Sequence, residues 1–372
     1  MKIGIPKEVK DHEYRVGATP AMVKTFTKAG HEVLIQTQAG SKIGFEDEDY
    51  KKVGATIVPG PREVYAADMV IKVKEPQPAE FPLLRENQIL FCYLHLAPDP
   101  NQTKALLEQK VVGIAFETVM DHKGHLPLLT PMSEVAGRIA VQSGAYALHM
   151  ASGGRGVLLG GVPGVSPGKV VVIGGGVVGT NATKMAVGLG ADVTILDNNL
   201  HRLRELDDLF AGKARTLYST PATVESEVIA ADLVVGAVLI PGKVAPKLIT
   251  KGLVKQMKHG SVIVDVAIDQ GGCCETSRPT THSDPIFVQD NVVHYCVANM
   301  PGACARTATV ALTNSVLPYA LRLADLGYKE ALLRDPLFLP GLNVCLGKVT
   351  NEPVAHDLGY DYHPPEEVLK AL

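Results

Sequence analysis

The stretch VVVIGGGVVGTNATKMAVGLGADVTILD, residues 170–197, contains the pattern that decides the fold. An apolar run is followed by Gly174, Gly176 and Gly179, which have the spacing GxGxxG where a helix would begin with Val177 and Val178. The first glycine permits a tight turn, the second lets the backbone approach a pyrophosphate, and the third lets the helix pack on the strand. The free N–H groups and the dipole of the helix then favour phosphate. The stretch therefore predicts a Rossmann-type dinucleotide site.

An acidic residue closes the second strand of this unit. Asp197 lies where a carboxylate can accept hydrogen bonds from the adenosine ribose, and it would repel a 2′-phosphate, so the pattern favours NAD over NADP. Arg202 and Arg204 leave the NADP alternative open, since either could swing toward a phosphate. The plainer alternative is a glycine-tight strand–helix turn that binds no ligand.

Short apolar runs alternate with helical segments along most of the chain. In the first 120 residues, strands are expected within 2–6, 31–37, 55–59, 69–74, 89–96 and 111–117. Thr19 and Pro20 have the character of an N-cap and first residue of a helix that reaches Ala29. Later strands are expected within 169–176, 192–197, 231–240, 260–269 and 291–300. This alternation predicts an α/β fold with two Rossmann-like, doubly wound domains and a cleft between them.

The order of the elements predicts that one domain interrupts the other. A long helix is expected from Thr130 to about Met150, and the chain returns to helix from Thr307, after the last strand of the second sheet. We therefore expect a discontinuous substrate or catalytic domain over 1–129 and 307–372, with an NAD-binding domain over 130–306 inserted into it.

Two of the expected strands carry a polar residue near their carboxyl ends. The run ILFCYLHL is followed by a Pro-rich loop and contains His95 near its end, and the run MVIKVK ends at Lys74. Taken alone, such a His is most often a hydrogen-bonded bystander, and such a Lys usually reaches solvent. The roles of His95 and Lys74 must therefore be judged from the other residues of the chain.

Composition limits the classes of partner. The net charge of −3 gives no reason to expect nucleic acid or an anionic membrane. The charged N-terminus lacks a signal-peptide core, and no apolar run is long enough to span a bilayer. Six cysteines without CxxC or zinc-type spacing indicate reduced thiols in the cytoplasm and no structural metal.

The chain resembles one family along essentially its whole length: the L-alanine dehydrogenases of bacteria and archaea. The resemblance rests on these motifs, in order: GIPKEVKDHEYRVGATP, IKVKEP, YLHLA, PLLTPMSEVAGR, GGRGVLLGGVPGV, VIGGGVVG, ADLVVGAVLIPG, VDVAIDQGGC and VANMPGA. It implies reversible oxidative deamination of L-alanine to pyruvate and ammonium with NAD, usually in a homohexamer.

The resemblance also assigns roles to residues. It implies that Arg15 holds the substrate carboxylate, that Lys74 binds the carboxyl or keto oxygen, and that Tyr93 lines the pocket. On local sequence alone, Arg15 is better interpreted as a surface arginine beside Glu13, and the phenol of Tyr93 could equally make a buried structural hydrogen bond. His95 would move protons during carbinolamine formation and collapse, and Asp269, expected to close the strand within 260–269, would take part in catalysis. For the cofactor it adds Ser133, Arg202, Ser219, Val238, Leu239, Val266, Ala267, Ile268, Asp269, Arg278, Val297, Ala298, Asn299 and Met300. Asn299, expected at the end of its strand, would lie near both nicotinamide and substrate.

Three other functions stay open at this point. The related α subunit of proton-pumping transhydrogenase would bind NAD without an amino-acid pocket, but His95 and Lys74 disfavour it. A regulatory NAD sensor would have lost the polar residues that are present here. A dehydrogenase of the saccharopine group would need a roomier pocket. Cys274 and Cys304 depart from what the family leads us to expect, although the proposed chemistry needs neither.

Overall fold

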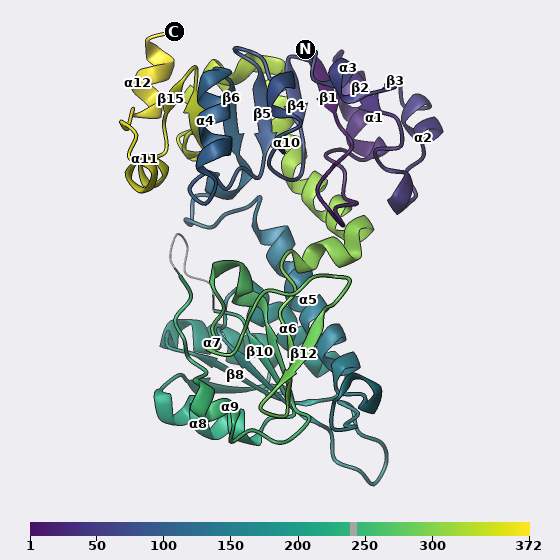
Figure 1. The fold of residues 1–372 in the computed structure, drawn as a ribbon, viewed down its shortest axis with the longest axis vertical. Helices are drawn as coiled ribbons and strands as arrows, with labels where there is room; N and C mark the ends of the chain where they lie inside the picture. The colour runs from purple at the N-terminus through teal and green to yellow at the C-terminus, as the bar shows by residue number, and fades with distance from the viewer. Residues whose placement is uncertain (239–243) are drawn as a thin grey trace. The chain divides into compact units, whose positions relative to one another are not determined.

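The computed structural model describes residues 1–238 and 244–372. The chain divides into two compact units, the first formed by Met1–Met132 with Cys304–Leu372 and the second by Ser133–Ala303 (Figure 1). The first unit is thus discontinuous in sequence, and the second is inserted into it. Which unit serves the substrate and which the cofactor stays a prediction.

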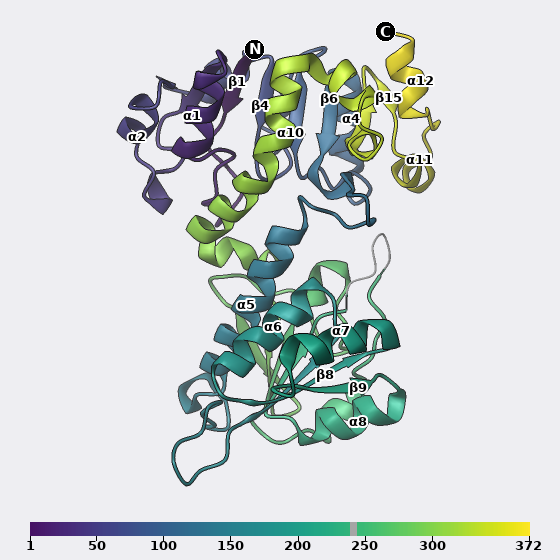
Figure 2. The ribbon, with the colours of Figure 1, turned by 180° about the vertical axis from the view of Figure 1, so that it is seen from behind.

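The first unit is built around one sheet with the strand order β15-β14-β6-β5-β4-β1-β2-β3. The strands from β6 to β3 in this order pair in parallel, while β14 and β15 are antiparallel additions that the sequence analysis did not foresee. Helix α4 lies in front of the sheet in Figure 1 and α10 lies in front of it in Figure 2, so helices cover both faces. The elements are β1 (Lys2–Ile5), α1 (Pro20–Lys28), β2 (Glu32–Gln36), α2 (Asp47–Lys51), β3 (Thr56–Val58), α3 (Pro61–Val64), β4 (Met69–Ile71), β5 (Ile89–Cys92), α4 (Pro100–Glu108), β6 (Val112–Ala115), α10 (Ala305–Leu333), β14 (Leu342–Cys345), β15 (Lys348–Val349), α11 (Glu352–Leu358) and α12 (Pro365–Lys370).

The second unit has the strand order β12-β13-β11-β10-β7-β8-β9, which is parallel except for β12. Its strand residues alternate between two apolar layers, because Val170 and Val172 pack with α5 and α6 while Val171 and Ile173 pack with α8 and α9. Burial on both faces explains the near-continuous Val and Ile runs. The elements are α5 (Thr130–Ala147, whose first residues belong to the first unit), β7 (Lys169–Ile173), α6 (Val177–Gly188), β8 (Asp192–Asp197), α7 (Leu200–Phe210), β9 (Arg215–Tyr218), α8 (Pro221–Ala230), β10 (Leu233–Gly236), α9 (Lys251–Val254), β11 (Val262–Asp265), β12 (Ile286–Gln289) and β13 (Val292–Tyr295).

Helix ends follow the local sequence. Thr19 caps α1 as predicted, since its side chain accepts a hydrogen bond from the N–H of Met22 and Pro20 occupies the first turn. Helix α5 is shorter than predicted: it ends at Ala147. A 3-10 helix follows at Met150–Ser152, and Gly153 ends it with a left-handed φ of 82°.

The predicted extensions of β4 to Lys74 and of β5 to Leu96 were wrong. Strand β4 ends at Ile71 and β5 at Cys92. The N–H of Val73 donates to Glu8, and the N–H groups of Leu94 and His95 donate to Glu117. Because these carboxylates replace a neighbouring strand as acceptors, the ladder stops and the chain turns.

Asp269 and Asn299 also lie beyond the strands that were expected to end with them. Strand β11 ends at Asp265, and Asp269 lies in the 3-10 turn Val266–Gln270. The buried carboxylate of Asp265 bends the chain back, because it accepts the N–H groups of Cys273 and Cys274. Strand β13 ends at Tyr295, and Asn299 adopts a left-handed φ of 60°.

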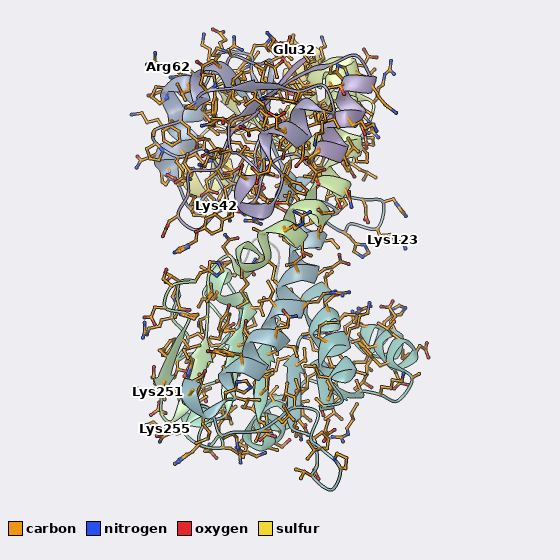
Figure 3. The ribbon with its side chains drawn as sticks, turned by 90° about the vertical axis from the view of Figure 1, so that its right-hand side faces the viewer. Glu32, Lys42, Arg62, Lys123, Lys251 and Lys255 are labelled. Atoms are coloured by element: carbon orange, nitrogen blue, oxygen red, sulfur yellow. The ribbon has the colours of Figure 1, made fainter. Side chains whose placement is uncertain are left out.

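Charged residues that are not paired with a buried residue lie on the outer surface of each unit (Figure 3). Arg62 and Glu32 are exposed on the first unit, and Lys251 and Lys255 are exposed on the second. In the part of the chain that the structure describes, no helix combines the length and apolar character needed to cross a bilayer.

Candidate active site

In the first unit, the predicted substrate residues follow the carboxyl ends of neighbouring parallel strands. Arg15 follows β1, Lys74 follows β4, and Tyr93 and His95 follow β5. These three strands are adjacent in the order β5-β4-β1 and run parallel, so their carboxyl ends meet at one edge of the sheet. Folds of this class bind ligands at that edge.

Arg15 is buried and paired with Glu13. Its Nε donates to Glu13 Oε1 at 2.7 Å and its Nη2 donates to Oε2 at 2.6 Å, while Nη1 lies 3.1 Å from the sulfur of Met132. Burial disfavours both charges, but the paired hydrogen bonds outweigh it, so the pKa of Arg15 is raised and that of Glu13 is lowered. The pair fixes the plane of the guanidinium.

Lys74 is a largely enclosed ammonium without an acidic hydrogen-bonding partner. Among the described residues its Nζ makes no hydrogen bond and no ion pair. Burial lowers the pKa of Lys74, and the nearby positive charge of Arg15 lowers it further. An anionic substrate at this position would neutralise the charge of Lys74, while Arg15 is already paired with Glu13.

Tyr93 and His95 form a stacked pair beside these cations. Their ring centroids are 5.9 Å apart with an interplanar angle of 9°. The hydroxyl of Tyr93 donates to the carbonyl of Leu128 at 2.6 Å, and burial raises the pKa of the phenol above its ordinary value. The His95 side chain is 46% exposed, so the imidazole can reach a ligand or water.

A second lysine on the same segment is entirely buried and fully paired. Lys72 Nζ donates to Glu8 Oε2 at 3.0 Å and to Glu80 Oε1 at 3.1 Å, and Tyr65 also donates to Glu80. Burial alone would lower the pKa of Lys72, but the two carboxylates outweigh it and raise the pKa. Glu8 also accepts the N–H of Val73, so this network anchors the segment that carries Lys74.

In the second unit, the glycine-rich turn between β7 and α6 has the form that a pyrophosphate needs. Gly174 has a left-handed φ of 103°. A Cβ on Gly179 would lie 1.8 Å from the Gly174 carbonyl oxygen, so only glycine fits there. A Cβ on Gly176 would meet nothing within 4 Å, which leaves open space beside the first turn of α6, where Val177 and Val178 present N–H groups.

Asp197 is held by the backbone of the same turn. Its Oδ2 accepts the N–H of Gly175 at 2.7 Å, and its Oδ1 accepts the N–H of Asn199 at 2.8 Å. Arg202 is also engaged, because its Nε donates to the Gly175 carbonyl at 2.7 Å and its Nη1 forms an ion pair with Glu205. The arrangement suits a ribose with a free 2′-hydroxyl.

The sequence VDVAID contains two aspartates with different environments. Asp265 is fully buried and accepts hydrogen bonds from the N–H groups of Cys273 and Cys274 and, at 2.6 Å, from the hydroxyl of Ser277. Asp269 is exposed in the turn that follows. Asp265 therefore shapes the loop, and Asp269 is the carboxylate that can meet a ligand.

The remaining predicted cofactor residues gather mainly at one edge of the second sheet. Ser219 follows β9, Val238 follows β10, Val266 to Asp269 follow β11, and Val297 to Met300 follow β13, all at the carboxyl ends of parallel strands. Ser133 lies in the first turns of α5, and the Arg278 guanidinium stacks 4.0 Å from the Phe287 ring centroid. Leu239 lies outside the described residues.

Sequence reasoning missed three acidic residues that organise the candidate residues within their own units: Glu8 and Glu117 in the first unit and Asp265 in the second. It placed Glu13 beside Arg15 but expected that arginine at the surface. Glu117 and Asp265 each follow or close a buried apolar run, which is the same signal that singled out His95. Applied consistently, that signal would have found both.

The residues of the second unit fit a dinucleotide. The open space at Gly176 and the start of α6 would accommodate a pyrophosphate, and the half-buried Asp197, later in the chain, would accept hydrogen bonds from a ribose. Within residues 1–238 and 244–372, no three His, Cys, Asp or Glu side chains cluster as a metal site would require.

Comparisons with known proteins agree on one family. Models described as alanine dehydrogenase/PNT match residues 4–136 (N-terminal domain) and residues 140–352 (C-terminal domain). The chain is 55% identical to alanine dehydrogenase 2 of Staphylococcus aureus strain USA300, over 100% of both chains. A solved L-alanine dehydrogenase matches with a TM-score of 0.94 and 53% identity, covering 96% of this chain and 99% of the other. A transhydrogenase from Sinorhizobium meliloti shares the fold, with a TM-score of 0.82, 23% identity and coverage of 95% and 99%.

Proposed function

Because the chain belongs to the alanine dehydrogenase/PNT family, we propose that it is an NAD-dependent L-alanine dehydrogenase that interconverts L-alanine with pyruvate and ammonium. The observation that supports this proposal most strongly is the enclosed ammonium of Lys74 next to the Arg15–Glu13 pair, with His95 at the same sheet edge. Two cations and one titratable group suit a small keto acid whose oxygen must gain or lose a proton.

NAD would be held by the second unit. The Gly174–Gly179 turn and the start of α6 would bind the pyrophosphate, and Asp197 would bind the ribose. The ion pair of Arg202 with Glu205 supports NAD rather than NADP, since it draws the nearest guanidinium away from a 2′-phosphate. When bound, NAD supplies the hydride acceptor for alanine oxidation, and NADH supplies the donor for the reverse reaction.

The substrate would be oriented by the first unit. Arg15 would bind the carboxylate, and the Lys74 ammonium would polarise the keto oxygen as negative charge develops on it. Tyr93, whose hydroxyl is committed to the Leu128 carbonyl, would act as an apolar wall that also sets the plane of the His95 ring.

His95 would be the proton carrier. In reductive amination, an imidazolium can protonate the carbinolamine hydroxyl so that water leaves, and the neutral ring can accept a proton from the attacking amine. The exposed Asp269 carboxylate would stabilise the positive charge of the iminium, and Asn299 would orient the reacting groups. These assignments follow the family and the residue chemistry.

We also propose that the protein is a cytoplasmic homohexamer. The free cysteines are buried except for the half-buried Cys304, which suits a reducing compartment. Light scattering on the purified protein would test the oligomeric state directly.

The decisive experiment follows NADH oxidation with pyruvate and ammonium, in parallel with reactions that omit ammonium, contain NADPH, or use His95→Ala. We expect ammonium-dependent turnover with NADH that is lost in the variant. NADH binding without turnover would overturn the proposal and favour an NAD-binding protein of the transhydrogenase type.

A further inference from the structure

We propose that Glu117 is a positioning residue that holds His95 in its working backbone conformation and presents one particular ring nitrogen to the substrate. This inference rests on the proposed function, because it assigns to His95 the proton transfer described above. Glu117 lies in the 3-10 turn Phe116–Thr118 immediately after β6, the neighbour of β5 in the sheet.

The Glu117 carboxylate accepts hydrogen bonds from two consecutive backbone N–H groups of the segment that contains His95. The N–H of Leu94 lies 3.1 Å from Oε1 and 3.2 Å from Oε2, and the N–H of His95 donates to Oε1 at 2.6 Å. The carboxylate is only 15% exposed. Hydrogen bonds from two adjacent N–H groups to one shielded carboxylate, of which the bond from His95 is short, give the segment a fixed position.

His95 itself adopts a conformation that needs such support. Its φ of 47° is in the left-handed region, which residues with a Cβ rarely occupy. Strained backbone of this kind persists when its surroundings over-determine it, and it concentrates at functional sites. The hydrogen bonds to Glu117 contribute to that constraint, because they fix the peptides on both sides of Leu94, including the one that immediately precedes His95.

The same carboxylate faces one nitrogen of the ring. His95 Nδ1 lies 3.7 Å from Glu117 Oε1, a distance that is electrostatic rather than a formed hydrogen bond. A negatively charged carboxylate at this distance attracts a proton to Nδ1 rather than to Nε2. Nε2 is then the nitrogen that exchanges protons with the substrate.

The other groups facing the ring are few in the described parts of the chain. Tyr93, in the same segment after β5, stacks on it, and its phenol stays neutral because burial raises its pKa. Arg15 adds positive charge on the Tyr93 side.

Two substitutions separate the two roles. Glu117→Gln keeps an oxygen for the backbone donors but removes the charge, while Glu117→Asp keeps the charge but shortens the reach. We expect Glu117→Gln to lower kcat for reductive amination roughly tenfold with the pyruvate KM within about twofold, and to move the acidic limb of the kcat/KM profile to lower pH. Glu117→Asp should lower kcat while leaving that limb near its original pH. Glu86→Gln, which removes the charge of an exposed carboxylate paired with Lys110, is the matched control and should change neither quantity.

A second readout does not depend on turnover. Diethyl pyrocarbonate modifies neutral imidazole, so the pH dependence of His95 modification, followed by peptide mass spectrometry, reports the protonation of that ring. We expect Glu117→Gln to shift this dependence to lower pH. An unchanged modification profile together with an unchanged kcat would overturn the inference. If the wild-type protein shows no turnover, the proposed function fails, and the modification profile still decides whether Glu117 controls His95.

Discussion

Glu13 and Arg15, two residues apart, form a buried two-point ion pair, with Nε–Oε1 at 2.7 Å and Nη2–Oε2 at 2.6 Å. Both residues are at least 95% shielded from solvent, and their charges act on nearby Lys74. A guanidinium held on two of its donor positions has one orientation instead of several. The pair therefore makes the proposed carboxylate-binding group rigid before a substrate arrives, which would reduce the entropy lost on binding.

Replacement of Glu13 by Gln should weaken substrate binding and stability together. The variant leaves a buried guanidinium without its charged partner, which costs about 3–5 kcal/mol when a buried pair is broken. We expect the pyruvate KM to rise at least about tenfold, measured beside a urea unfolding curve. Glu32→Gln, at an exposed carboxylate 3.4 Å from Lys2, is the control and should leave both values unchanged. A wild-type KM in Glu13→Gln would show that Arg15 does not need its partner.

Lys74→Met should abolish turnover and stabilise the fold. The folded-state pKa of Lys74 is lowered by burial and then by Arg15, so the protonated lysine costs stability fully below that folded pKa. The cost disappears as the pH rises from the folded pKa to the unfolded value near 10.4. We expect Tm to rise by roughly 2–4 °C near pH 7 for a gain of about 1 kcal/mol, and the gain to shrink at alkaline pH. Lys104→Met, at an exposed site, is the control. A lower Tm in Lys74→Met would contradict this account.

Lys72→Met should have the opposite effect on stability, although the substitution is chemically the same and two residues away. Lys72 is enclosed by Glu8 and Glu80, and its removal leaves two buried carboxylates facing each other. The expected loss is about 3–5 kcal/mol in the free energy of unfolding. Because the folded-state pKa of Lys72 is raised, its contribution is fully present below the unfolded pKa and persists through neutral pH. Lys110→Met removes an exposed partner of Glu86 and should cost little. Equal free energies of unfolding for Lys72→Met and Lys74→Met would refute the proposed difference between the paired and the unpaired lysine.

The cofactor half of the candidate site was predictable because its signal is local. Gly174, Gly176, Gly179 and Asp197 lie within one strand–helix–strand unit, so spacing alone carries the physical requirement. The contacts of the acidic residues were not predictable in this way, although the position of Glu117 and Asp265 after or at the end of apolar runs marks both as candidates. Glu117 reaches His95 only because β5 pairs with β6, so its role depends on a pairing that no short window of sequence contains.

The predictions of where strands end failed for the same reason. The apolar run of β5 continues to Leu96 in sequence, but the chain leaves the ladder after Cys92 because Glu117 accepts the next N–H groups. In VDVAID, alternation could not tell which aspartate is buried. The structure distinguishes them because Asp265 accepts hydrogen bonds from residues that follow it and Asp269 lies exposed in the turn between.

Asp197→Asn should change cofactor discrimination as well as cofactor affinity. The carboxylate accepts two backbone N–H groups and carries the charge that would oppose a 2′-phosphate. The asparagine side chain has the same shape as aspartate but no charge, and its NH2 group would face one of the two backbone N–H donors that the carboxylate now accepts. We therefore expect NADH binding to weaken about tenfold, and NADPH binding to weaken less or to improve, so that the ratio of the two Kd values narrows. Titration calorimetry with each cofactor measures this without turnover. Asp192→Asn, at the exposed start of β8, is the matched control and should leave both Kd values unchanged. An unaltered Kd ratio in Asp197→Asn would mean that the discrimination comes from other groups, of which Glu205, through its ion pair with Arg202, would be the next to replace.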